Sequence, residues 1–443
     1  MLRGKFVFVE LVADSLLTLD IEKPAAGGRM LARHNGQVVL VWGAIPGERV
    51  LARVERSGKG VLYAETHEVL AASPDRRHAV ADWRCGGNVL AHVSYPRQLQ
   101  LKSEIIRDGF ARIGRMPLAT PPAVIGSPEH GYRMRARLHV RNGRIGFIRE
   151  GSHDLCAVAP TAQMLPDTSA WIATAEEALR RDRLVGLTSI EIAENISGGE
   201  RACHLELEPG TNATPFAALA RHGLTGLSAQ VIGRRGIEQL CGVPFVSDVL
   251  HIRPDDPATA VRLRREARAF FQGNRFLLET LVRHIAALVP SGPIVDLYAG
   301  VGLFGLSLAT AGATDVTLVE GDLISGRDLD GNAEPFAGRV RVEHSSIEAY
   351  VRAMTPPGDS TFIVDPPRTG MSKEALSGIV RHAPKRIVYV SCDVATLARD
   401  ARMLVDGGYS LDEMTGIDLF PNTAHVECVA VFNCDATKTT KTV

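Results

Sequence analysis

The stretch Ile294-Val295-Asp296-Leu297-Tyr298-Ala299-Gly300-Val301-Gly302 decides how the last third of this chain folds. Its first four residues form a short, mostly apolar run, as expected of a buried strand in a parallel sheet. The glycines that follow allow a tight turn into a helix and let a ligand approach the backbone. The stretch therefore predicts a strand, a glycine turn and a helix at the start of an α/β sheet.

Further apolar runs follow this stretch, and helical segments are expected between them. The runs span residues 315–320, 339–343, 360–365, 386–391, 409–418 and 425–433. Strands that alternate with helices predict a mostly parallel, doubly wound sheet, whose ligands lie beyond the carboxyl ends of the strands. A helix over residues 260–289 is expected to lead into the first strand.

The front of the chain has a different pattern, with short strands separated by glycine turns. Strands are expected at residues 5–12, 30–32, 37–42, 49–55 and 60–69. This spacing predicts a small β-barrel, a fold that often holds nucleic acid, although a solvated barrel would have the same pattern. Together with a central α+β region, the expected domains are residues 1–70, 75–260 and 261–443.

Basic residues are concentrated in the front of the chain although the formal net charge is zero. Residues 1–150 contain 23 Lys and Arg against 14 Asp and Glu, which leaves 27 against 36 in the remainder of totals of 50 and 50. Arg133, Arg135 and Arg137 alternate along a predicted strand, so they share one face. A basic front half suggests contact with a nucleic-acid backbone, with chance surface charge as the alternative.

The bulk composition is that of a soluble globular protein, and a cytoplasmic location is expected. Hydrophobic residues make up 45% and charged residues 23%, and no apolar run reaches the ~20 residues of a membrane helix. The amino terminus lacks the pattern of a secretory signal. Seven cysteines without a C-x-x-C pair predict reduced thiols rather than a disulfide framework or a zinc site.

The glycine turn and the end of the second strand predict a site for an adenosine-type cofactor. Gly300 lies in the turn, and Glu320 ends the next strand about twenty residues later, where a carboxylate can bind ribose hydroxyls. Both NAD and S-adenosylmethionine satisfy this pattern. The third glycine of the dinucleotide motif is missing from its usual place, and no hydride-acceptor site follows, so the methyl donor is favoured.

Three further side chains are expected at the same edge of the sheet. Asp365 ends a strand in a loop stiffened by two prolines, although it could be a plain turn residue. Cys392 follows a strand and precedes a helix, whose amino terminus is expected to lower the pKa of the thiol. Glu427 lies in an apolar strand, where burial would raise its pKa towards that of a general base; pairing with an Arg is the alternative.

At these residues the chain resembles the RNA uridine-5 methyltransferases, which make 5-methyluridine in transfer and ribosomal RNA. The resemblance covers nearly the full length and includes an amino-terminal barrel like the TRAM domain and a Rossmann-like class I methyltransferase domain at the carboxyl terminus. The motifs that carry it are Phe270-Phe271-Gln272-Gly273-Asn274, Asp365-Pro366-Pro367-Arg368, Ser391-Cys392-Asp393 with Ala395-Thr396-Leu397-Ala398-Arg399-Asp400, and His425-Val426-Glu427.

The resemblance implies a role for each matching residue. Cys392 would be the nucleophile that adds to carbon 6 of uracil, and Glu427 the base that removes the proton from carbon 5. S-adenosylmethionine would be the cofactor, and an RNA the substrate. The residues that the resemblance implies in cofactor binding, or in the site around the cofactor, are Gln272, Tyr298, Glu320 and Asp365; the glycine turn adds Gly300.

Two departures from the family pattern affect these expectations. Many members hold an iron–sulfur cluster with four cysteines, but this chain has Cys85-Gly86-Gly87-Asn88 at that place and Thr161 at the later position. Because Cys156 cannot complete a four-thiolate set, no cluster and no metal are expected. Leu303 stands where relatives often have a polar residue beside the cofactor, which would alter affinity without removing the site.

Other functions remain as alternatives at this point. A cytosine-5 RNA methyltransferase would carry a second Cys in the loop of Asp365, and an adenine amino methyltransferase an Asn-Pro-Pro-aromatic loop; neither is present. A noncatalytic RNA-binding protein that retained the fold would not need Cys392 and Glu427. The sequence does not identify the RNA, the uridine or the oligomeric state, for which a monomer is the default expectation.

Overall fold

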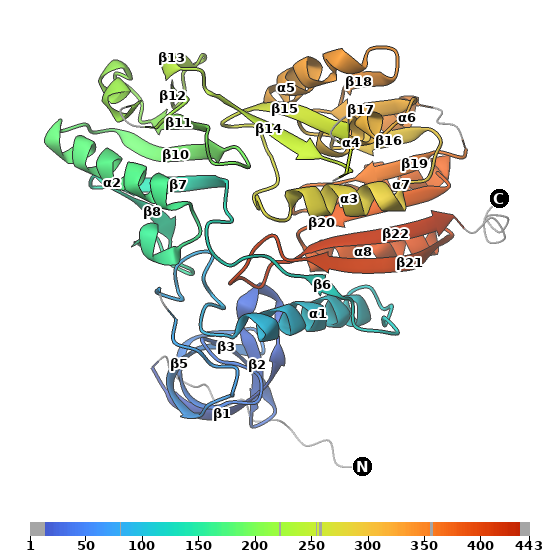
Figure 1. The fold of residues 1–443 in the computed structure, drawn as a ribbon. Coiled ribbons are helices and arrows are strands. Elements are labelled where there is room, and N and C mark those ends of the chain that lie inside the picture. The colour runs from blue at the N-terminus through green and yellow to red at the C-terminus, as the bar shows by residue number, and fades with distance from the viewer. Residues whose placement is uncertain are drawn as a thin grey trace.

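The computed structural model describes residues 14–79, 81–220, 223–253, 255–256, 259–354 and 358–434. Figure 1 shows a barrel at the bottom, a sheet with one long helix at the upper left, and a larger α/β sheet on the right. The strand expected over residues 5–12 lies outside the described residues. In the described part, no helix has both the length and the apolar character needed to cross a membrane.

The amino-terminal strands form a closed barrel, as predicted, but its first strand spans Leu16–Pro24, where no strand was expected. They pair in the order β1-β2-β3-β5-β4, and β4 closes the barrel against β1. Side chains from alternate positions, such as Leu19, Val39 and Val50, fill its interior because successive residues of a strand point to opposite faces. The strands are β1 (Leu16–Pro24), β2 (Met30–His34), β3 (Gln37–Trp42), β4 (Arg49–Gly58) and β5 (Val61–Ala71).

The central sheet has seven strands in the order β13-β12-β11-β10-β7-β8-β9. Helix α2 (Pro166–Arg181) packs Trp171, Ile172 and Leu179 against its apolar face. The strands are β7 (Arg135–Arg141), β8 (Arg144–Ile148), β9 (Leu155–Ala157), β10 (Leu187–Glu194), β11 (Arg201–Leu207), β12 (Gly226–Val231) and β13 (Glu238–Gly242).

The predicted cationic face of β7 is balanced by carboxylates from neighbouring strands. Arg135 pairs with Glu191 of β10 at 3.1 Å, and Arg137 pairs with Glu206 of β11 at 2.6 Å. These partners lie about 55 to 70 residues away in sequence, so the strand alone could not reveal them. Arg133 precedes β7 and has no ion pair among those found in the described residues.

The large sheet confirms the predicted doubly wound fold. Its order is β18-β17-β16-β19-β20-β22-β21-β6. The first five strands in this order are parallel to one another, and β22 is antiparallel to both β20 and β21. The strands are β16 (Ile294–Leu297), β17 (Val316–Glu320), β18 (Val340–His344), β19 (Thr361–Val364), β20 (Arg386–Ser391), β21 (Tyr409–Ile417), β22 (Glu427–Cys434) and β6 (Val124–Ile125). The helices are α3 (Leu278–Leu288), α4 (Leu303–Thr310), α5 (Leu323–Ala333), α6 (Ile347–Ala353), α7 (Lys373–His382) and α8 (Val394–Asp406).

The helix predicted over residues 260–289 is wrong in its first half. Strands β14 (Phe245–His251) and β15 (Ala260–Glu266) form an antiparallel hairpin, and α3 begins only at Leu278. In β15 the residues Val261, Leu263 and Arg265 are buried while their neighbours are exposed, which is a period of two. The loop between β15 and α3 carries Gln272.

Helix α1 (Tyr95–Arg112) and β6 pack on the large sheet although they come from the segment assigned to the central domain. β6 pairs with β21, and the fully buried Lys102 of α1 forms an ion pair with the fully buried Asp418. The Lys102 ammonium also donates to the carbonyl of Phe420 at 2.9 Å. These contacts fix the loop after β21, which leads to β22.

Two cysteines form a disulfide, which corrects the expectation of reduced thiols. Cys85 and Cys156 are bonded, with their Cα atoms 5.8 Å apart. Cys85 lies beside β8, where the amide of Gly86 donates to the carbonyl of Ile148, and β9 carries Cys156 next to the same strand. Strand pairing thus joins cysteines that are 71 residues apart in sequence.

Candidate functional site

One cavity of about 700 Å³ lies at the carboxyl ends of the parallel strands. The carboxyl ends of four strands meet at this cavity because the strands are parallel: β16, β17, β19 and β20. The cavity brings together all seven residues that the sequence identified as catalytic or cofactor-binding: Gln272, Tyr298, Gly300, Glu320, Asp365, Cys392 and Glu427.

The glycine turn after β16 provides an open backbone surface. Gly300 and Gly302 have φ of +58° and +97°, in the region that glycine adopts readily. A Cβ on Gly302 would come within 2.4 Å of Leu306, so this glycine is needed for packing. A Cβ on Gly300 would meet no described heavy atom within 4 Å, which leaves space at the cavity for a ligand.

Glu320 lies at the end of β17 and is hydrogen-bonded to the glycine turn. Its carboxylate accepts hydrogen bonds from the amides of Gly300 at 2.7 Å and Asp322 at 2.6 Å. Burial raises the pKa of Glu320, and these amides oppose the rise. Asp322 in turn caps α5 by accepting from the amides of Ile324 and Ser325. The side chain is therefore held in a fixed orientation at the cavity wall.

Asp365 and Gln272 form a hydrogen-bonded pair from distant parts of the chain. The Gln272 amide donates to the Asp365 carboxylate at 3.0 Å, across 93 residues of sequence. Desolvation raises the pKa of Asp365 to about 7, and the bond from Gln272 opposes this rise. At neutral pH this carboxyl is therefore close to its point of titration.

Cys392 is half-buried at the start of the turn into α8. Asp393 caps this helix by accepting from the amide of Thr396 at 2.8 Å. The expected lowering of the thiol pKa is wrong: burial raises the pKa to about 12. Glu427 and Asp365 add to the rise because a thiolate would lie near two carboxylates, while Arg368 opposes it.

Glu427 is buried at the start of β22, with 1% of its surface exposed. Neither carboxylate oxygen has a hydrogen-bond partner among the described residues. As expected, burial raises its pKa well above the ordinary value; Asp365 adds to the rise and Arg368 opposes it. An unpartnered carboxyl is costly in a structural core, so its place on the cavity wall indicates a ligand-binding role.

The cavity also contains residues that the motifs did not assign. Arg133, Arg135 and Arg268 line it together with Phe270, an aromatic side chain that is 57% exposed. Within this basic rim, Arg135 and Arg268 are ion-paired with Glu191 and Glu266, and Arg133 has no ion pair among the described residues. The Arg alternation was the one sequence signal for the rim. Leu419 and Phe420 come from the loop that Lys102 anchors.

Asp296 lies beneath the glycine turn and is fully buried. One oxygen accepts from the amide of Gly305 at 2.8 Å, and the other has no partner among the described residues. Burial raises its pKa to about 8, so the carboxyl is mostly protonated at neutral pH. Leu303, expected beside the cofactor, is buried and is not among the residues that line the cavity.

The residues of the cavity fit S-adenosylmethionine. Its acidic groups suit a ligand with a cationic sulfonium and ammonium, and Glu320 lies where ribose hydroxyls are bound in folds of this kind. The open backbone at Gly300 admits the cofactor closely. The two unpartnered oxygens of Glu427 mark the part of the cavity where a second ligand would bind.

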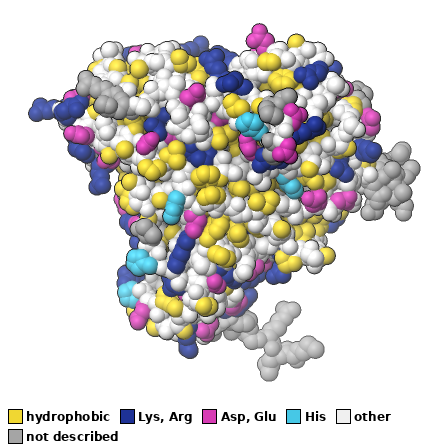
Figure 2. Space-filling view, viewed as in Figure 1, with side chains coloured by type: hydrophobic (Ala, Val, Ile, Leu, Met, Phe, Trp, Pro, Cys, Tyr) yellow, Lys and Arg dark blue, Asp and Glu magenta, His cyan; other side chains and the backbone are white. Residues whose placement is uncertain are grey.

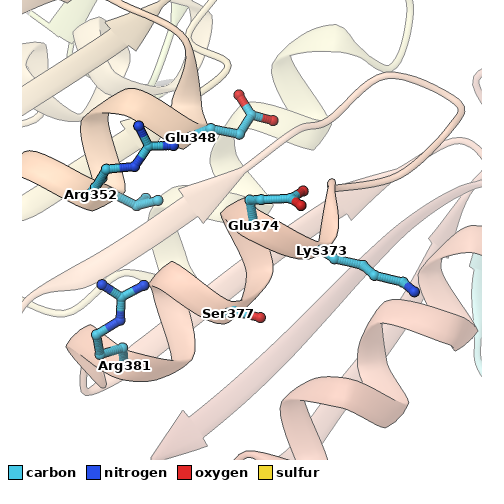
Figure 3. A pocket seen from close by; sticks show the side chains of 7 residues that line it. Glu348, Arg352, Lys373, Glu374, Ser377 and Arg381 are labelled. Atoms are coloured by element: carbon cyan, nitrogen blue, oxygen red, sulfur yellow. The ribbon is translucent and has the colours of Figure 1, made fainter.

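A smaller cavity of about 310 Å³ lies between α6 and α7, away from these residues. Figure 3 shows Arg352 and Glu348 on α6 and Arg381 and Glu374 on α7 around it. Both signs of charge are mixed on its walls, and none of the predicted site residues lies there. The large cavity at the strand ends is therefore the candidate active site.

Two family models match the ends of the chain. Residues 15–66 match the TRAM domain, and residues 358–434 match the tRNA (uracil-5-)-methyltransferases. A barrel of this kind joined to a doubly wound sheet with a cofactor cavity defines an S-adenosylmethionine-dependent RNA methyltransferase.

Curated relatives match over almost the whole length. The chain is 31% identical to the 23S rRNA (uracil(1939)-C(5))-methyltransferase RlmD of Pseudomonas putida, covering 94% of this chain and 93% of that protein. It is 34% identical to the enzyme of the same name from Halomonas elongata, covering 92% and 88%. The chain therefore belongs to the family of RNA uracil-5 methyltransferases.

A solved structure supports the same assignment. The Pyrococcus abyssi tRNA (uracil-54, C5)-methyltransferase, in complex with S-adenosyl-L-homocysteine, superimposes with a TM-score of 0.73 and 27% identity. The match covers 94% of this chain and 99% of that one. The similarity therefore extends over nearly the whole of both chains.

Proposed function

We propose that this enzyme methylates carbon 5 of a uridine in 23S ribosomal RNA, with Cys392 as the nucleophile and Glu427 as the base. The observation that carries the proposal is the single cavity where both side chains meet the cofactor residues. Ribosomal rather than transfer RNA is chosen because relatives with 31% and 34% identity are named as 23S rRNA enzymes. The similar archaeal structure is named for a tRNA, so transfer RNA is the second candidate.

The first half of the reaction uses Cys392. Carbon 5 of uracil is a weak nucleophile, and addition of sulfur to carbon 6 turns the ring into an enolate. The thiol first releases its proton to solvent, and the thiolate then bonds to carbon 6 as the electron pair of the ring double bond moves towards oxygen 4. Burial raises the thiol pKa, and Arg368, which lowers it, favours the thiolate.

The second half uses Glu427. When bound, S-adenosylmethionine supplies the electrophilic methyl group. Glu427 then accepts the proton of carbon 5, the ring double bond re-forms, and the bond from carbon 6 to Cys392 breaks to release the thiolate. A carboxylate with a raised pKa is a stronger base once ionised, so the burial of Glu427 suits this step.

Five residues would hold the cofactor, and each has a distinct place in the cavity. Gly300 offers open backbone, Glu320 a fixed carboxylate, and Asp365 with Gln272 a hydrogen-bonded pair. Tyr298 lies between β16 and the glycine turn with φ of +63°. The resemblance to the family supports four of these residues, and the glycine turn supports Gly300.

The RNA would approach across the basic rim of the cavity and the barrel. The barrel carries Arg29 stacked between Trp42 and Tyr63. Figure 2 shows hydrophobic side chains over the middle of one face, with Lys and Arg at the upper left and between the barrel and the upper domains. A buried cavity requires that the target nucleotide be extruded from folded RNA. We further propose a cytoplasmic, monomeric enzyme. Its domains are the barrel near residues 1–70, a central domain within residues 75–260, and a catalytic domain over residues 261–443 that α1 and β6 join from the central segment.

Trapping with 5-fluorouridine tests the covalent route. The fluorine cannot leave as a cation, so an RNA with 5-fluorouridine at the target should stay bound to Cys392 in the presence of cofactor. The Cys392→Ala variant should form no adduct while it binds S-adenosylmethionine as tightly as the unaltered enzyme. An Ala variant that still methylates RNA would refute the nucleophile.

The choice of RNA is tested separately. Mass-spectrometric mapping of 5-methyluridine in cells that lack this protein should reveal one missing site in 23S ribosomal RNA, with transfer RNA unchanged. Purified enzyme should methylate an unmodified 23S fragment faster than an unmodified tRNA. The opposite preference would assign the enzyme to transfer RNA and leave the chemistry intact.

A further inference from the structure

Helix α8 carries a second pair of functional side chains beyond the nucleophile at its start. Arg399 and Asp400 lie in its second turn and belong to the motif that runs from Ser391 to Asp400. Neither lines the cavity. Their contacts go instead to the loop that follows Asp365-Pro366-Pro367-Arg368.

Asp400 is the buried member of the pair, with 1% of its side chain exposed. One oxygen accepts from the amide of Met371 at 2.9 Å and from the hydroxyl of Tyr389 at 2.7 Å. The other accepts from Arg399 at 2.8 Å. Tyr389 lies on β20, two residues before Ser391, so Asp400 connects the strand, the helix and the loop around the thiol.

Arg399 holds the same loop from the outside. Its guanidinium donates to the carbonyl of Thr369 at 3.1 Å and to that of Met371 at 3.3 Å. Between these residues Gly370 has φ of +75°, and a Cβ there would come within 2.5 Å of Arg399 and 2.8 Å of Asp400. The loop therefore fits against α8 without room for a side chain.

We propose that Arg399 and Asp400 are positioning residues that hold the 365–371 loop against α8, so that Asp365 and Arg368 keep a fixed position relative to Cys392. The inference rests on the proposed function, in which Cys392 is the nucleophile. The loop follows β19 and the thiol follows β20, which are adjacent parallel strands.

The pair has an electrostatic consequence for the thiol. The charged groups that face Cys392 are Glu427 of β22 and Asp365 and Arg368 of the loop, and only Arg368 favours the thiolate. A loop that moves away from α8 would take this cation with it. Ionisation of the thiol would then need a higher pH, and adduct formation would slow at neutral pH.

The same helix provides a matched control. Arg402 and Asp406 form an exposed i, i+4 ion pair on α8, with 38% and 60% of their side chains exposed. The contacts of this pair that the structure gives do not involve the 365–371 loop. Loss of the Arg402 pair removes a charge and an ion pair from the helix without releasing the loop.

The experiment compares Arg399→Ala, Arg399→Lys and Arg402→Ala in the full-length enzyme. The readout is the single-turnover rate of adduct formation with 5-fluorouridine RNA as a function of pH, with thermal unfolding and cofactor binding measured alongside. Arg399→Ala should slow adduct formation about 10- to 100-fold and move its pH profile upward by roughly one unit. Cofactor affinity should stay within about threefold, and Arg399→Lys should recover part of the rate.

Several outcomes would decide the matter. An unchanged rate and pH profile in Arg399→Ala would overturn the inference, as would an equal loss in Arg402→Ala. A lower melting temperature with an unchanged rate per folded molecule would assign the pair a purely structural role and also overturn it. Absence of an adduct in the unaltered enzyme would instead refute the proposed function. Asp400→Asn, if it folds, should behave like Arg399→Ala.

Discussion

Buried carboxyl groups at two places in this molecule differ in whether they have hydrogen-bond partners. At the junction of the central and catalytic domains, Glu194 accepts from Arg201 at 2.7 Å and from Arg275 at 2.6 Å. Nearby, Asp248 accepts from the buried Arg265 at 2.9 Å. In the cavity, by contrast, Glu427 has no hydrogen-bond partner among the described residues.

The difference separates carboxyl groups that are paired within the fold from one that is not. A buried charge is tolerated when its hydrogen bonds are satisfied, and removal of one partner leaves the other exposed to the full desolvation cost. At the junction each carboxylate has Arg partners within the chain, although Nη1 of Arg265 and Nε of Arg275 have no hydrogen-bond partner among the described residues. Glu427 has no such partner among the described residues, which costs stability.

The strongest test of this comparison replaces Glu427 by Gln. Loss of the base should lower the rate of product formation about 10²- to 10⁴-fold, because a general base contributes that much to proton transfer. Stability should be unchanged or slightly higher, since no hydrogen bond is lost. Methylation kinetics and thermal unfolding of the same preparation measure both. A marked fall in melting temperature would mean that Glu427 has a structural partner.

The matching change at the junction replaces Glu194 by Ala. Arg201 and Arg275, both 5% exposed, would lose the carboxylate between them, which should destabilise the protein by about 3–5 kcal/mol. Urea unfolding at neutral pH measures the loss. Molecules that remain folded should retain the chemical rate, because the cavity is not touched. If stability stayed the same, the contrast between the two groups would fail.

The Cys85–Cys156 disulfide is a covalent crosslink, so its effect on stability does not depend on buried charge. Cys85→Ser should lower stability by about 2–4 kcal/mol, because the bond closes a long loop of the unfolded chain. The exposed Cys241 gives a control, and its Ser variant should unfold like the unaltered enzyme. Reductant should destabilise the unaltered enzyme but leave Cys85→Ser unaffected. Equal stability with and without reductant would show that the bond is absent in solution.

The smallest effect is expected in the pH dependence of stability. The Asp296 carboxyl titrates near 8 in the fold and near 3.8 in an ordinary environment, so the folded state binds more protons between these values. Stability should therefore fall as the pH rises through this window. Asp296→Asn should reduce the fall between pH 5 and pH 8 by at least about 1 kcal/mol. An unchanged slope in urea titrations would contradict the protonated state.

Much of the site could be predicted from the sequence because parallel strands all end at one edge. Once the runs before Gly300, Glu320, Asp365 and Cys392 were recognised as strands, their ends had to meet at a common cavity. The barrel followed equally from short strands and glycine turns. These inferences need only local patterns and the geometry of a sheet.

The sequence-based predictions were wrong where a local pattern fitted both a helix and a strand, and where residues distant in sequence set the pKa of a group. The segment Ala260–Glu266 was taken for helix, although the burial of alternate residues makes it a strand paired with β14. The thiol of Cys392 was expected to have a lowered pKa from its helix alone. Glu427 and Asp365, brought in by other strands, reverse that direction.

The class of fold, the family and the residues that meet at the cavity could be inferred from the sequence, since these depend on short-range patterns and motifs. The folded molecule was needed to reveal the Cys85–Cys156 bond, the ion pairs that neutralise β7, and the contacts of Arg399 and Asp400 with the 365–371 loop. Each of these depends on atoms that are far apart in the chain and close in space. The desolvation and Coulomb energies that set charge states depend on such distances, which no local pattern contains.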